Sequence, residues 1–289
     1  MKAMGKGMLT GTAAALGAFT IAAGAAGTQA ASFQSQMQNV GTLLDGDVQG
    51  KLQGMSKQLK QVSIDTGAAT SDLTDGLYQV VSAFGESAES VKQLEIAAKA
   101  AKAGNATTTD SVNMLSAVTK GYGDTSAAAL QKASDLAFLT VKLGQTSFPE
   151  LASSMGQVVP LAATMKVSQE ELFGAMATLT GVTGGTAEVT TQLRATMQEF
   201  LSPSSQMEKA LKKMGYTSGA AALESEGLGG ILTKLKESVK GDEVAFANLF
   251  SSIESKNAVL ALTGAQADAF AEKTAAMGEA AGATDRAFN

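Results

Sequence analysis

The chain of 289 residues contains no Cys, no His and no Trp, and only 3 Pro. Without Cys there is no disulfide, no thiolate metal ligand and no cysteine nucleophile. Without His the chain lacks the commonest metal ligand and the usual general base. A carboxylate pair or a Ser–Lys arrangement remains open to it, but the expectation of an enzyme falls. We therefore predict no catalytic residue, no metal site and no cofactor.

The charge and the aromatic content narrow the class of protein further. The chain has 22 basic and 27 acidic residues, a net charge of −5, so we predict no sequence-specific binding of nucleic acid through a basic face. Aromatic residues are only 5%, and the 13 Met must help to fill the core. Few Pro favour helix, whereas 31 Gly predict frequent breaks. The composition indicates many short helices.

The N-terminal region is uncharged and rich in small residues. Residues 7–44 carry no charged side chain, and residues 7–31 include ten Ala and five Gly. A secretory signal peptide cleaved near Ala31 is one interpretation, and a membrane span is another. Because Leu, Ile and Val are few, the drive into lipid is weak. We favour a hydrophobic helix that packs against protein in one state and enters a bilayer in another, through Leu9, Leu16, Phe19 and Ile21.

From residue 46 onward the apolar residues follow a helical period. Leu73, Leu77, Val80 and Phe84 share one helix face, and similar stripes recur along the chain, without a convincing strand pattern. We predict an all-α protein whose core lies on these stripes. The packing or partner-contact candidates are Leu151, Met155, Val158, Leu172, Met176, Leu193 and Met197.

Helix starts and breaks can be read between the stripes. Ser147 stands three residues before Glu150, and Ser168 three before Glu171, as in capping boxes. Pro160 should kink or end its helix after Val159. The Gly-rich residues 218–230 are expected to form a loop, with Gly230 among the helix ends. The pattern of residues 202–216 predicts a short capped helix, and that of residues 242–262 predicts two short helices.

An internal repeat organises the middle of the chain. Thr70, Thr108 and Thr146 are spaced 38 residues apart, and residues 70–85 align on residues 108–123 without gaps. This period suits a helical hairpin that buries its face against its neighbours. We predict a bundle of short tandem helical hairpins with an Ala/Gly-rich hydrophobic N-terminal helix. The expected divisions are a hydrophobic segment at 1–45, a hairpin core at 46–215, and an irregular helical extension at 216–289 that continues in a longer chain.

Two carboxylate pairs are candidates for catalytic groups. Glu170–Glu171 and Asp242–Glu243 could flank a glycoside in a cleft. Both pairs fall in predicted first helical turns, where acidic side chains favourably meet the helix dipole. Capping is therefore the favoured role. The glycines of 181–185 and 227–230 lack the Lys-Ser/Thr of a phosphate-binding loop and are interpreted as turns between helices.

Four segments carry a resemblance to a known family. They are TVKLGQTSFPELASSMGQVVPLA (140–162), VSQEELFGAMATLT (167–180), TQLRATMQEFLSPS (191–204) and KALKKMGY (209–216). Together they resemble the core region of tail tape measure proteins of tailed bacteriophages, over about residues 60–289. The resemblance implies a helical structural protein that occupies the lumen of the tail tube and sets tail length during assembly. It also implies help in delivering the genome across the host membrane, without a cofactor.

The same resemblance implies partners and a location. These are other copies of the chain (a homo-oligomer, with a trimer as one option), tail tube and tail tip proteins, assembly chaperones and the host inner membrane. The expected location is the virion tail, assembled in the host cytoplasm, and the host membrane during ejection. Family members are usually longer, with extended coiled coils, whereas this chain has no sustained heptads. The alternatives are a cell-wall-degrading or other carboxylate-dependent enzyme module of a tail, and a secreted helical protein with a signal peptide.

Overall fold

The computed structural model describes residues 26–289, with side chains from residue 31 onward. The described residues are 77% helical and contain no strand, which confirms the predicted all-α class and its helical hairpins. An isolated bridge joins Thr180 and Gly184 in the turn before α9. In chain order the helices are α1 (Ala26–Gly41), α2 (Val48–Thr66), α3 (Thr70–Phe84), α4 (Ser90–Gly104), α5 (Thr108–Tyr122), α6 (Ala127–Leu143), α7 (Phe148–Thr164), α8 (Gln169–Leu179), α9 (Thr186–Leu201), α10 (Ser205–Lys213), α11 (Gly219–Ser238), α12 (Glu243–Ala247), α13 (Ile253–Thr263), α14 (Ala267–Gly278) and α15 (Ala283–Phe288).

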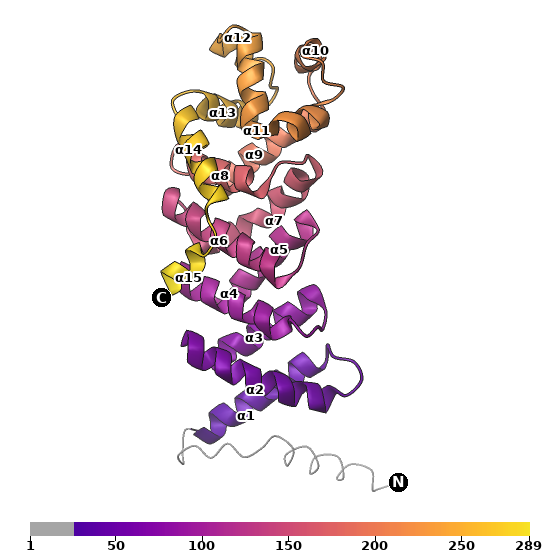
Figure 1. Cartoon of the computed structure of the whole chain (residues 1–289), viewed down its shortest axis with the longest axis vertical. Helices are drawn as coiled ribbons and strands as arrows, with labels where there is room; N and C mark the ends of the chain where they lie inside the picture. Colours follow the sequence, from indigo (N-terminus) through magenta and orange to yellow (C-terminus); the bar gives the residue numbers. More distant parts are fainter. Residues whose placement is uncertain (1–25) are drawn as a thin grey trace. The chain divides into compact units, whose positions relative to one another are not determined.

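The described part of the chain divides into two compact units, residues 26–91 and residues 92–289. In the first unit α1, α2 and α3 pack against one another (Figure 1). Leu59, Leu73, Leu77 and Val80 are completely buried there. The predicted boundaries at residues 45 and 215 stay predictions, and the predicted N-terminal hydrophobic helix with Leu9, Leu16, Phe19 and Ile21 lies outside the described residues.

The second unit is built from two rows of helices. In one row α5 packs on α7, α7 on α9, and α9 on α13. In the other row α6 packs on α8, and α8 packs on α14. The helices α7 and α9 begin 38 residues apart, at Phe148 and Thr186, as α3 and α5 do at Thr70 and Thr108. Within the second unit, neighbouring repeats therefore bury their apolar faces against each other, as in helical-repeat proteins.

The C-terminal segment runs back along the second row. After α13, which packs on α9, the helix α14 lies on α8 and the helix α15 lies on α6. The helices α6 and α8 belong to two successive repeats. The segment from Ala267 to Phe288 therefore crosses these two repeats in the direction opposite to their order in the chain.

Several predicted helix starts are confirmed. Ser147 and Glu150 form a reciprocal capping box at the start of α7, and Ser168 accepts the N–H of Glu171 at 3.2 Å at the start of α8. Ser204 caps α10 by accepting the N–H of Met207 at 3.1 Å. The two short helices predicted between residues 242 and 262 are α12 and α13.

Pro160 does not end its helix, so that half of the prediction of a kink or an end is wrong. It lies inside α7, which continues to Thr164. A proline in a helix interior removes one hydrogen bond and costs about 3 kcal/mol. The turns after Pro160 bury Ala162 and Met165 completely, and this apolar burial offsets the lost bond.

The loop predicted for residues 218–230 is also wrong. These residues belong to α11, interrupted by a single non-helical residue, Gly227, with φ 70° and ψ 175°. Gly230 therefore lies within the helix and does not end it. Leu223, Leu228 and Ile231 are buried, so packing outweighs the roughly 1 kcal/mol that each helical glycine costs.

Candidate functional site

The seven side chains predicted for packing or partner contact lie at the centre of the second unit. They come from α7, α8 and α9, and each has a relative exposure of 0%. None reaches solvent in the folded chain, so they hold the helices of the unit together. Contacts with another chain would have to use other residues. The seven are Leu151, Met155, Val158, Leu172, Met176, Leu193 and Met197.

The carboxylates of Glu170 and Glu171 serve separate structural contacts. Glu170 forms an ion pair with Lys132 of α6, with an Oε1–Nζ distance of 2.7 Å. Glu171 accepts the backbone N–H of Gly229 at 3.3 Å, just after the break in α11. The start of α8 is thereby attached to α6 on one side and α11 on the other.

The carboxylates of the second predicted pair, Asp242 and Glu243, also make structural contacts. Asp242 caps α12 by accepting the N–H groups of Val244 at 2.9 Å and Ala245 at 3.0 Å. Glu243 is exposed, and its carboxylate lies 3.7 Å from the Nζ of Lys236. Across residues 26–289 no cluster of His, Cys, Asp or Glu is arranged to hold a metal ion.

Two buried carboxylates were missed by the sequence reasoning. Glu199, near the end of α9, is 8% exposed. It accepts the N–H of Ser251 at 2.6 Å, the N–H of Ser252 at 2.8 Å and the hydroxyl of Ser252 at 3.0 Å. It therefore ties the end of α9 to the start of α13. The available signal was its position in an apolar helix, between the stripe residues Met197 and Phe200.

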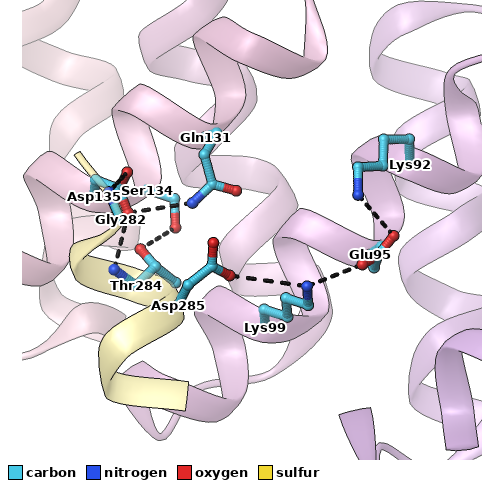
Figure 2. A network of polar contacts seen from close by, with 9 residues as sticks. All are labelled: Lys92, Glu95, Lys99, Gln131, Ser134, Asp135, Gly282, Thr284 and Asp285. Carbon is cyan, nitrogen blue, oxygen red and sulfur yellow. Dashed lines mark hydrogen bonds and ion pairs between the residues drawn. The ribbon is translucent and has the colours of Figure 1, made fainter. Parts of the chain in front are cut away.

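Asp135 is the other buried carboxylate, 3% exposed in the middle of α6. Its oxygens accept the backbone N–H groups of Gly282 and Thr284, both at 2.8 Å, at the start of α15 (Figure 2). The hydroxyls of Ser134 and Thr284 lie 2.8 Å apart beside it. The signal in the sequence was an acidic residue within the apolar run of α6.

A chain of charges continues from this junction to α4. Lys99 lies 3.8 Å from Asp285 and 3.0 Å from Glu95, which also pairs with Lys92 at 3.0 Å (Figure 2). Burial raises the pKa of Glu95, but hydrogen bonds and charge from Lys99 and Lys92 outweigh it, so that the pKa lies below its ordinary value.

Three large apolar side chains, one each on α9, α12 and α13, are exposed. Leu201 is 50% exposed, Val244 72% and Ile253 65%. A buried aromatic cluster joins α9, α12 and the connection between α12 and α13. Its ring centroids are 6.2 Å apart for Phe200–Phe250 and 5.5 Å apart for Phe246–Phe250. We name Leu201, Val244 and Ile253 the apolar corner.

A cavity of about 440 Å³ lies between α11 and the residues that follow it. Its walls include Thr233, Lys236, Glu237 and Thr263. The two threonine hydroxyls donate to backbone carbonyls within their own helices, and the Nζ of Lys236 donates to the carbonyl of Thr263 at 2.6 Å. These polar groups are already used in holding the fold together.

Among the described residues, no helix is both long enough and apolar enough to be a candidate membrane span. The predicted membrane-entering side chains Leu9, Leu16, Phe19 and Ile21 precede the part that the structure describes. Their role remains a prediction.

Comparison with known proteins identifies the family of this chain. The chain is 26% identical to a probable tape measure protein of Clostridium phage phiCD119 over 297 residues, which cover 99% of this chain and 31% of that protein. The chain thus spans about a third of that relative's length. No solved structure matches the chain. The model of the family described as phage-related minor tail protein matches residues 56–253. With that match over more than half of its length, the chain belongs to the phage-related minor tail protein family.

Proposed function

We propose that this chain is a folded module of a tape measure protein, which occupies the tail tube and takes part in setting tail length. The observation that carries the proposal is the family match over residues 56–253, joined by the similarity to a probable tape measure protein along nearly the whole chain. A structural role in the virion tail follows from the family. The carboxylates once considered for catalysis cap helices or form ion pairs, which suits a structural protein.

The partners proposed are other copies of the chain, tail tube and tail tip proteins, and assembly chaperones. The seven candidates from the sequence are internal, so the contacts fall to exposed side chains. The apolar corner is the best placed of these, because apolar side chains that are half or more exposed gain free energy when another protein covers them.

The folded state changes how this module would measure length. A continuous α-helix rises about 1.5 Å per residue, so one 38-residue repeat would span about 57 Å if fully extended as helix. In the second unit, neighbouring helices of a row are packed side by side, and packed helices lie only about 8–10 Å apart. A repeat in this packed form therefore adds about a sixth of the extended length.

Tail lengths in engineered phages test the length-setting role. Three extra tandem copies of residues 108–145, which contain α5 and α6, should lengthen the tail by about 30 Å if the repeats stay packed. If the repeats are extended when the tail is measured, the increase should be about 170 Å. Electron microscopy of purified particles measures the change against a recoded but otherwise unaltered phage. Tails of unchanged length would contradict a length-setting role for this segment.

Residence in the tube is tested separately. Mass spectrometry of purified particles should find peptides of residues 92–289 in intact tails and lose them after triggered genome ejection. Retention of these peptides in emptied tails would place the module in the tube wall or tip, and contradict a position in the lumen.

A role at the host membrane is proposed for residues 7–31. A peptide of these residues should release dye from vesicles of bacterial lipid composition, and Leu16→Asp together with Phe19→Asp should abolish the release. A mature N-terminus near Ala31 in the purified protein would instead favour the signal-peptide interpretation.

A further inference from the structure

The helix α15 cannot be stable by its own contacts. It has six residues, whereas isolated helices shorter than about 12–15 residues are marginal even in favourable sequences. Its N-cap residue is Gly282, at φ 74°, which has no side chain to accept an N–H of the first turn. Those donors can be satisfied only by water or by another part of the chain.

Asp135 supplies the missing cap from α6. One carboxylate oxygen accepts the N–H of Gly282 and the other accepts the N–H of Thr284, both at 2.8 Å (Figure 2). The carboxylate is 3% exposed, so water competes little for these bonds. A negative charge at this end of a helix is also favoured by the helix dipole. An N-cap that most helices carry in their own sequence is here supplied from nearly 150 residues away.

Apolar burial adds little to the docking of α15. Its fully buried side chains are the small Ala283 and Thr284, and Phe288 is only half-buried. The preceding helix differs, because α14 buries Phe270 and Met277. The stabilisation of α15 therefore rests chiefly on polar contacts. The largest set is the pair of hydrogen bonds at the buried Asp135 carboxylate, beside the Ser134–Thr284 hydroxyl contact and the Lys99–Asp285 ion pair, whereas α14 is held by the hydrophobic effect.

We propose that residues 282–289 form a latch, which folds when it docks on α6 and unfolds when it leaves, with Asp135 coupling the two events. When the latch is open, α14 on α8 is the last docked helix, and Ser134 and Asp135 on α6 become uncovered. When it is closed, α15 on α6 is the last docked helix, one repeat further along the row. Gly282, in the left-handed region, is the hinge.

Hydrogen exchange on the full chain tests the latch. In the wild-type protein the hydrogen-bonded amides of Arg286–Phe288 should exchange at least tenfold faster than the amides of Phe173–Thr178 in α8, because the latch opens without the rest of the unit. Asp135→Asn keeps the side-chain shape but loses the charge and one acceptor oxygen. It should speed exchange in α15 about tenfold or more and leave the α8 amides unchanged.

Matched variants separate the cap from general effects. Asp285→Asn removes a carboxylate of α15 itself, 3.8 Å from Lys99, and should change α15 exchange by less than about threefold. Thr284→Ala removes the hydroxyl contact with Ser134 and keeps the N–H bond to Asp135, so its effect should be smaller than that of Asp135→Asn.

Two results would overturn the latch. One is equal protection of α15 and α8 in the wild-type protein, which would make α15 part of the cooperative core. This outcome can be read even if Asp135→Asn does not fold. The other is unchanged α15 exchange in a folded Asp135→Asn variant, which would show that the carboxylate does not couple docking to folding.

Discussion

Gly174 of α8 and Thr274 of α14 lie so close together that there is no room for a side chain at position 174. A β-carbon at Gly174 would stand 3.0 Å from the Cα of Thr274 and would also meet its hydroxyl oxygen. A side-chain hydroxyl can rotate away, but the Cα belongs to the backbone and cannot move without shifting α14. This glycine therefore sets how closely the returning C-terminal segment packs on the repeats.

Gly174→Ala should lower the free energy of unfolding by about 1–3 kcal/mol, because the added methyl group pushes two packed helices apart. Gly156→Ala in α7 is the matched control, since its β-carbon would meet only the β-carbon of Ala117, at 4.0 Å. The control should be neutral or stabilise by up to about 1 kcal/mol, because alanine favours helix. Urea denaturation measures both, and equal values would contradict the close crossing.

Glu199→Ala should destabilise the protein by roughly 2–4 kcal/mol. The substitution leaves the N–H groups of Ser251 and Ser252 without their acceptor in a part-buried place. Glu199→Gln, which keeps one acceptor oxygen, should cost less. Glu224→Gln on the exposed side of α11 is the control and should stay within about 0.5 kcal/mol of the wild type. A loss at Glu199→Ala no larger than this would show that the buried carboxylate does not tie α9 to α13.

Lys166 ends α7 in the left-handed region, at φ 61°. The N–H of Val167 bonds to the carbonyl of Ala162 at 3.0 Å, so the turn requires this conformation. Lys166→Gly should stabilise the protein by about 0.5–1 kcal/mol, because glycine adopts positive φ without strain. Gly123→Ala, at φ 79° with open space around it, should have the opposite sign in thermal denaturation. If both substitutions have the same sign, strain at positive φ is not the cause.

Glu95 makes stability depend on pH at the acidic end. Its folded-state pKa is lowered, so the folded protein binds its proton less readily than the unfolded chain does. Its contribution is present above the ordinary pKa of a glutamate and is lost as pH falls through the lowered folded value. The stability gap between wild type and Glu95→Gln should therefore shrink from pH 6 to pH 3. A constant gap would contradict this coupling to Lys99 and Lys92.

The sequence was sufficient for the features that depend on neighbours along the chain. The apolar stripes, the capping box of Ser147 and Glu150 and the caps of α8 and α10 are local, because each requires residues within about one helical turn. The 38-residue period likewise predicted helices that pack in series. The absence of His and Cys pointed away from enzymatic chemistry before any fold was known.

Tertiary packing decided the features in which burial competes with local preference. Pro160 and Gly230 lie within helices because buried side chains around them outweigh the local cost of a proline or glycine. Asp135 and Glu199 meet backbone amides from segments about 50 to 150 residues distant, which no spacing in the sequence encodes. The return of α14 and α15 along α8 and α6 is decided in the same way. Local sequence determines which residues form a helix, and only the folded chain determines which faces are left for other segments to cover.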